Sequence, residues 1–230
     1  MTENIICHNI EAFNQPEPTR NKGGDCFACA TLAALRWLYP EKNFEFDQVW
    51  DSFKLTQTNP NGDSFEFLGN SWLSYSKVFE QISKKMDLPD LSWRINSCYP
   101  TFIGFGRTAG NWNRDSGQYG EYWQKLCEDL KTGVVILSIN KDGEGPWKNG
   151  CWNEIDHLVL IDGVRKRTVP VKGMPWASKI NWEVRIVCSR NGCVWKTIWE
   201  LLDLHGAGAW HVLEKSQNKL YKNCHETKSP

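Results

Sequence analysis

The chain has 230 residues, which is enough for one domain with a sizeable buried core. Its 27 basic and 27 acidic residues cancel, and no long run of like charge stands out, so we expect neither nucleic acid nor a membrane as a partner. No apolar stretch approaches the roughly 20 residues of a membrane-spanning helix. These bounds predict a single domain over residues 1–230.

The chain contains nine cysteines, an odd number at irregular spacings. Residues 1–15 have neither the basic start nor the apolar core of a signal peptide. Disulfides are rare in the cytosol, so we interpret most of these cysteines as reduced thiols of a cytoplasmic protein.

Residues 1–20 contain Pro16 and Pro18 and show little periodicity, which predicts an extended N-terminal arm over the surface. A helix is then expected up to Leu38. The pair Gly23-Gly24 favours a tight turn before it, and Asp25 is a typical N-cap residue.

This arrangement places Cys26 in the first turn of an apolar helix. Unpaired backbone N–H groups and the helix dipole favour a thiolate there, which predicts a lowered pKa. We therefore interpret Cys26 as a catalytic nucleophile.

The pattern further along the chain predicts three more helices and a turn. The helices are expected at 47–54, 71–86 and 121–131, the last ended by Gly133, and a turn is expected at 59–62. Residues 98–120 are rich in Gly, Asn and Arg, and are either a functional loop or a surface insertion.

Strand signals dominate the second half, so the fold class is expected to be α+β. Strands are predicted at 134–139, 157–164, 182–188 and 209–213, with a short helix at 196–202. Residues 214–230 are expected to form a polar, frayed tail.

A cysteine nucleophile needs a base, and imidazole is the usual one. Of the five histidines, His157 stands at the start of an apolar strand, 131 positions after Cys26, within the range of about 130 to 150 found between papain-type Cys and His residues. We take His157 as the candidate base, with His205 and His211 in reserve.

These segments carry a family resemblance. The pattern Asn21-x4-Cys26 resembles the Gln-x4-Asp-Cys-Gly-x-Ala start of the double-glycine, bacteriocin-leader-cleaving peptidases, and Gly24-Asp-Cys-Phe resembles the Gly-Asp-Cys-Trp of calpains. The runs Gly133-Val-Val-Ile and His157-Leu-Val-Leu-Ile-Asp-Gly are similar to the strands of papain-like enzymes. The resemblance implies a papain-like α+β fold, in which an N-terminal helical half bearing the cysteine packs on an antiparallel sheet bearing the histidine.

The resemblance also implies roles for three further residues. Asn21 stands where the family has its oxyanion-hole Gln. The third catalytic residue is an Asn or Asp at the end of the strand after the histidine strand, and here that strand ends in Cys188-Ser-Arg-Asn. Ser189 or Asn191 could accept a hydrogen bond from the histidine Nδ1–H.

The implied activity is hydrolysis of a peptide or isopeptide amide bond in a protein or peptide substrate, through a thioester and without cofactor or metal. Acyl transfer of the transglutaminase type is an alternative. A non-catalytic binding module on the same scaffold is another, with a Trp-rich surface formed by Trp112, Trp147, Trp152 and Trp176.

Two other interpretations of the cysteines were considered. Cys26-x-x-Cys29 could form a thioredoxin-type redox pair, although no strand signal precedes it. The same pair with Cys188 and Cys193 could hold structural zinc, although the second spacing is wide and the first pair opens an apolar helix. Free buried thiols are expected for the other cysteines.

Overall fold

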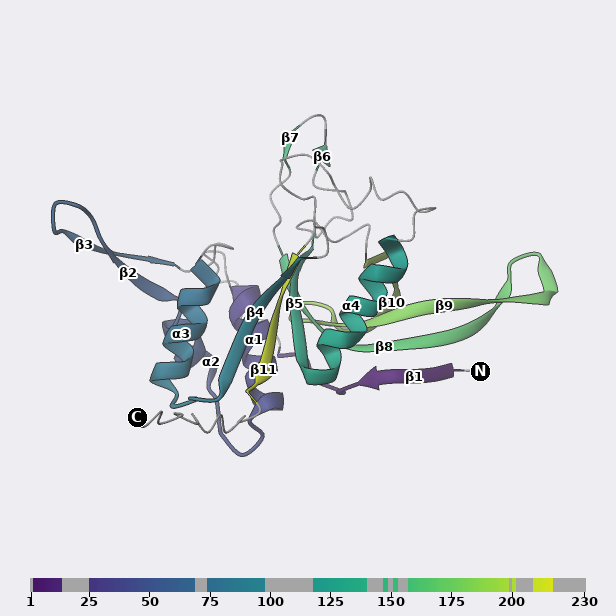
Figure 1. Ribbon diagram of the computed structural model, residues 1–230, viewed down its shortest axis with the longest axis horizontal. Coiled ribbons are helices and arrows are strands. Elements are labelled where there is room, and N and C mark those ends of the chain that lie inside the picture. The colour runs from purple at the N-terminus through teal and green to yellow at the C-terminus, as the bar shows by residue number, and fades with distance from the viewer. Residues whose placement is uncertain are drawn as a thin grey trace, which may run out of the picture.

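The computed structural model describes residues 2–13, 25–68, 74–97, 118–139, 147–148, 151–152, 157–198, 200–201 and 209–216. They form an α+β fold of helices and antiparallel strands, in which strand residues outnumber helical ones (Figure 1). The expected α+β class is therefore confirmed.

The described strands form one seven-stranded sheet and two small hairpins. The main sheet has the order β10-β9-β8-β5-β11-β4, and β1 also pairs with β8. Its strands are β1 (Thr2–Cys7), β4 (Leu91–Ser97), β5 (Gly133–Ile139), β8 (His157–Val171), β9 (Met174–Cys188), β10 (Gly192–Thr197) and β11 (Ala209–Lys215). The hairpins are β2 (Lys54–Thr58) with β3 (Ser64–Leu68), and β6 (Trp147–Lys148) with β7 (Cys151–Trp152).

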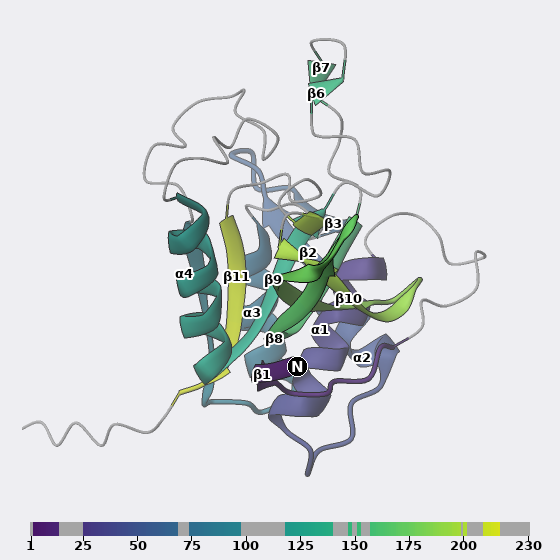
Figure 2. The same ribbon diagram turned by 90° about the vertical axis from the view of Figure 1, so that its right-hand side faces the viewer.

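Four helices are described: α1 (Asp25–Leu38), α2 (Phe46–Asp51), α3 (Tyr75–Lys85) and α4 (Gln118–Thr132). Helices α1 to α3 cover one face of the main sheet, and α4 covers the other, as Figure 2 shows edge-on for α1 and α4. The alternation of strand side chains builds both cores. In β5, Val134 and Ile136 face α1, while Val135 and Leu137 face α4.

Helix α1 is the most buried of the described helices. Twelve of its 14 residues are buried, including Phe27, Leu32 and Leu35 at 0% exposure. A helix that is apolar on nearly all sides requires cover on nearly all sides. The sheet supplies one side, and α2, α3 and the aromatic rings around Phe27 supply the others, with Tyr75 at 3.9 Å and Phe53 at 4.8 Å between ring centroids.

The first residues of the chain belong to the sheet. The expected surface arm is extended, but β1 pairs with β8 from Cys7↔Gly163 to Thr2↔Arg167. Beyond β1, the backbone N–H of Ile10 donates to buried Asp162 at 2.7 Å, and Arg185 donates to Ile10 O at 3.1 Å and to the same carboxylate. This buried ion pair holds the segment that leads toward Cys26. Residues 14–24 lie outside the described part.

Most expected elements are present, with shifted ends. Strands β2, β3 and β4 were not predicted, and the segment expected as a helix from residue 196 is still strand β10 up to Thr197. Helical backbone follows at residues 198 and 200–201, where Thr197 Oγ1 accepts from the Glu200 N–H at 3.2 Å. The expected tail begins inside β11, which runs to Lys215, and residues 217–230 are not described.

Gly133 is the first residue of β5 rather than only the end of the preceding helix. A Cβ atom placed there would lie 2.1 Å from Leu213 O on β11. The close approach of the two strands therefore requires a residue without a side chain.

Among the residues of the structure described above, no helix is both long and apolar enough to cross a bilayer.

His211 on β11 is fully buried, with its ring 4.8 Å from that of Tyr75 and 5.9 Å from that of Phe79. Burial lowers its pKa from 6.5 to about 4, because the charged imidazolium is poorly solvated in this core. The reserve base His211 is therefore a neutral core residue at neutral pH.

We predict that His211 makes folding stability depend on pH. The folded-state pKa lies below the unfolded value, so the unfolded chain takes up the proton first, and stability is lost as the pH falls from 6.5 toward about 4. The full effect amounts to about 3 kcal/mol. Urea unfolding of wild type and His211→Leu across this range measures it. The variant should lose less stability, and equal slopes for the two proteins would contradict the prediction.

Candidate active site

Helix α1 brings Cys26 to the start of strand β8. The helix begins at Asp25, as expected, and packs against β8 and β5. Cys26 is 8% exposed, and the backbone N–H of Leu158, the second residue of β8, is near enough to its sulfur to act on the pKa of the thiol. The fold thus joins two segments that are more than 130 positions apart in the sequence.

The expected lowered pKa of Cys26 is corrected by the structure. Burial raises the pKa of this thiol above its ordinary value of 9.0. The Leu158 N–H, the positive charge of Arg190 and the N–H groups of Phe27 and Cys26 itself oppose the rise but do not cancel it. The helix start acts in the expected direction, and desolvation outweighs it.

The hydrogen bond of the His157 ring joins it to a thiol on the neighbouring strand. His157 is 4% exposed, and its Nε2 lies 3.1 Å from Sγ of Cys188 at the end of β9. The Arg190 N–H also donates to this sulfur, at 3.5 Å. With His157 Nε2–H as donor, Cys188 Sγ is the acceptor that orients the imidazole, although sequence reasoning did not single it out for this role.

The candidate nucleophile and base approach β8 from different faces of the sheet. Alternation along β8 places His157 with Val159 and Ile161 on the α4 face, where Cys188 also lies. Leu158 faces α1, and Cys26 belongs to the core on that face. The two candidates are therefore near adjacent residues of β8 but on opposite faces of the sheet.

The other expected site residues take different places. Ser189 is buried at the start of the turn after β9, and Asn191 is exposed in the same turn. The hydrogen-bond partner found for His157 Nε2 is Sγ of Cys188, one residue before Ser189. Asn21, His205 and residues 98–117 lie outside the described residues.

Ser189 is instead a neighbour of Cys29, one helical turn after Cys26. Burial raises the pKa of the Cys29 thiol to about 12; Asp25 and Cys26 add to the rise, and the Ser189 hydroxyl opposes it. Cys29 is 1% exposed, so it is a core thiol in its protonated form. Asp25 is also buried, and its Oδ2 finds no hydrogen-bond partner among the described residues.

The alternative roles of the cysteines find little geometric support. Six cysteines within the described part of the chain are free: Cys7, Cys26, Cys29, Cys127, Cys188 and Cys193. All described strand pairs are antiparallel, so the parallel βαβ setting of thioredoxin-type pairs is missing from this part of the chain. Within the same part, no three His, Cys, Asp or Glu side chains are grouped as metal ligands.

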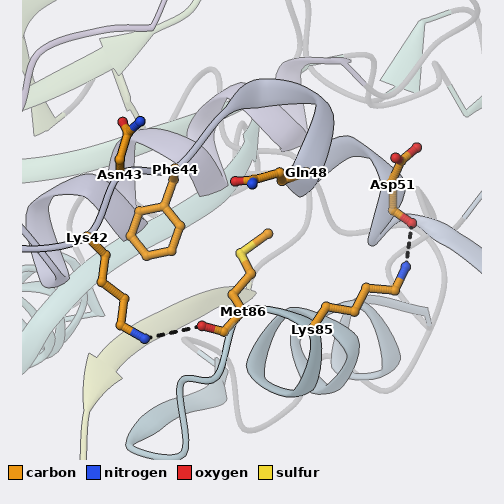
Figure 3. A pocket seen from close by; sticks show the side chains of 7 residues that line it. All are labelled: Lys42, Asn43, Phe44, Gln48, Asp51, Lys85 and Met86. Atoms are coloured by element: carbon orange, nitrogen blue, oxygen red, sulfur yellow. Dashed lines mark hydrogen bonds between the residues drawn. The ribbon is translucent and has the colours of Figure 1, made fainter.

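A pocket of about 510 Å³ lies elsewhere, between the loop after α1, helix α2 and the end of α3 (Figure 3). Phe44 and Met86 line it, and its two lysines are held by backbone carbonyls: Lys42 Nζ donates to Met86 O at 3.2 Å and Lys85 Nζ to Asp51 O at 2.9 Å. Helix α1 spans about 20 Å, and the pocket adjoins the loop after its C-terminal end, whereas Cys26 is at the N-terminal end. The candidate catalytic residues do not line it.

We predict that alkylation reports the raised pKa of the buried Cys26 thiol. Iodoacetamide labelling across pH, with peptide mapping, should show Cys26 reacting with an apparent pKa above that of a free cysteine, because burial raises it. Arg190→Gln should raise this apparent pKa further, since the Arg190 charge lowers it. Lys196→Gln, a change of exposed charge on β10, is the control. An apparent pKa for Cys26 below the free-thiol value would contradict the prediction.

The described residues gathered at the start of β8 are therefore two thiols, an imidazole and a guanidinium, those of Cys26, Cys188, His157 and Arg190. This set can supply a sulfur nucleophile, a base and an acceptor that orients the base. Comparisons of the chain with protein-family models, with curated proteins and with solved structures find no match.

Proposed function

We propose that this protein is a cysteine-dependent hydrolase that cleaves a peptide or isopeptide amide bond on a papain-like α+β domain. The observation that carries the proposal is the meeting of Cys26, at the start of a buried helix, with the start of the strand on which His157 is held by Cys188. A nucleophile at a helix start, a base at a strand start and an acceptor at the end of the next strand are the parts such a mechanism requires.

In the proposed reaction, His157 Nδ1 removes the Cys26 proton as the sulfur attacks the carbonyl carbon. The oxyanion that forms is stabilised by the Cys26 backbone N–H and by Asn21. The imidazolium then protonates the leaving amine, the C–N bond breaks, and a thioester remains on Cys26. Water, deprotonated by His157, hydrolyses the thioester and releases the acid.

The raised pKa of Cys26 bears on how the first step proceeds. A protonated thiol in the free protein requires base catalysis during attack rather than a preformed ion pair. Nδ1 must therefore come within hydrogen-bond distance of Cys26 Sγ when substrate binds. Because the two side chains lie on opposite faces of the sheet, this approach requires the first residues of β8 to change conformation when substrate binds.

Cys188 takes the place that an Asn or Asp has in papain-like enzymes. Its sulfur is a weaker acceptor than an amide or carboxylate oxygen. In the proposed mechanism it accepts from Nε2–H, 3.1 Å away, and this tautomer leaves Nδ1 as the base. In this proposal Cys188 is a positioning residue.

A non-catalytic protein-binding module is the second candidate, and one observation favours it. Desolvation keeps Cys26 protonated, and Cys29 beside it is held protonated as well. If the protein is such a binding module, Cys26 and His157 contribute only to packing.

Transfer of the acyl group to an amine instead of water is a third alternative. It uses the same first step as hydrolysis and differs from it in the molecule that accepts the acyl group.

We predict that a peptidyl vinyl sulfone, an electrophile that reacts with cysteine nucleophiles, modifies Cys26. Mass spectrometry of digested protein should place the adduct on Cys26, and His157→Ala should slow its formation by about 10² to 10⁴. Cys29→Ser, which changes the neighbouring thiol, should leave the rate nearly unchanged. An adduct on Cys188 would make that residue the nucleophile, and the absence of any adduct would favour the binding module.

Two variants of Cys188 distinguish positioning from nucleophilic attack. Cys188→Ala should slow adduct formation by up to about 100-fold, because the imidazole loses its acceptor. Cys188→Asn should keep or increase the wild-type rate, because its amide oxygen can accept from Nε2–H. Loss of reactivity in both variants, with folding intact by circular dichroism, would contradict a positioning role.

A further inference from the structure

Strands β8 and β9 extend well beyond the rest of the sheet. The last partner of β1 on β8 is Arg167, and the last partner of β10 on β9 is Glu183. Residues 168–180 therefore form a two-stranded ribbon, here called the distal ribbon, which projects from the body of the molecule (Figure 1). An isolated pair of strands is marginally stable in water, so such a ribbon gains from a binding partner.

The distal ribbon exposes apolar side chains that the body of the protein would normally cover. Trp176 is 83% exposed, Ile180 61% and Met174 51%. These are three of the six large apolar side chains that are exposed among the described residues. Neighbouring exposed apolar side chains at the end of a projecting element are typical of an interaction surface.

The same hairpin is strongly basic. Between Val164 and Trp182 the chain has five basic residues and no acidic one: Arg165, Lys166, Arg167, Lys172 and Lys179. The nearest acid, Glu183, is buried at the base of the ribbon, where it pairs with Arg165 and Arg167 at 2.7 Å. The pairing of β8 with β9 thus gathers positive charge in one place, although the net charge of the whole chain is zero. Lys172 and Lys179 lie in the same ribbon as the exposed apolar side chains.

We propose that the distal ribbon binds the surface of an anionic lipid bilayer. Tryptophan is favoured at the interface between lipid and water, and lysine stems can cover apolar surface while their charges reach the headgroups. Each basic residue near an anionic leaflet adds attraction, and a fluid bilayer accepts a line of apolar side chains without a shaped pocket. Binding of this kind is peripheral and needs no membrane-spanning helix.

A nucleic acid is the other polyanion that a basic ribbon could bind. The exposed side chains of the ribbon beside its lysines are mainly apolar, with Ser178 and Thr168 as small polar exceptions. Recognition of nucleic acid relies mainly on hydrogen bonds to phosphates and base edges. The exposure of Trp176, Ile180 and Met174 therefore favours lipid.

The ribbon is remote from the candidate active site. His157 begins β8 and Lys172 follows its end, which separates them by roughly 50 Å of extended strand. The lipid proposal therefore does not depend on the proposed hydrolase activity, and each can fail alone.

Sedimentation of the full chain with vesicles tests the proposal. The protein should pellet with phosphatidylcholine vesicles that contain phosphatidylserine, far less with phosphatidylcholine alone, and less as salt is raised. Lys172→Gln with Lys179→Gln should weaken binding roughly 25-fold, about fivefold for each lysine. Trp176→Ser with Ile180→Ser should also weaken it, because the apolar contact is lost.

Matched controls change similar side chains elsewhere. Phe65→Ser removes a 49%-exposed aromatic ring from β3, and Lys84→Gln removes an exposed charge from α3. Both should bind like wild type, and all variants should keep the wild-type unfolding temperature. Failure of the protein to bind the anionic vesicles, or equal loss in the control variants, would overturn the proposal. Binding of duplex DNA without vesicle binding would overturn it in favour of nucleic acid.

Discussion

The packing of α1 against the first half of β8 is the contact on which the rest of the structure depends. The helix has almost no polar face, so it must be enclosed by the sheet, α2 and α3. That enclosure places the N-terminal end of the helix near Leu158, the residue that follows His157 in the sequence. The Asp162–Arg185 ion pair adds a second constraint, because it ties Ile10 to β8 and β9.

The same enclosure opposes the chemistry that the helix start favours. Helix N–H groups and Arg190 stabilise a thiolate at Cys26, while loss of water destabilises it by more. A buried thiol kept protonated is protected from oxidation and alkylation, and it becomes reactive only when a base is brought to it. In the proposed mechanism His157 supplies that base and Cys188 orients it. The raised pKa of Cys26 thus makes proton transfer part of the attack.

Strand β8 connects two regions of different character. Its first residues pair with β5 and carry the candidate base; after the irregularity at Ile161/Gly163 it pairs with β1 instead. Among the described strands, only β9 pairs with its last residues, and the two form the distal ribbon. One long strand can therefore hold a buried polar site at one end and an exposed basic and apolar surface at the other, because the neighbouring strands end at different points along it.

Local pattern was enough to predict α+β and the elements with strong periodicity, such as α1, α3, α4, β5 and the start of β8. It did not reveal β4 or the pairing of β1, because both depend on partners far away in the sequence. It identified Cys26 and His157 as candidates from their positions at a helix start and a strand start. Tertiary structure alone decided the rest. Burial by segments distant in the sequence raises the pKa of Cys26. The pairing of β9 with β8 brings Cys188 to His157, a contact that the order of residues along the chain does not reveal.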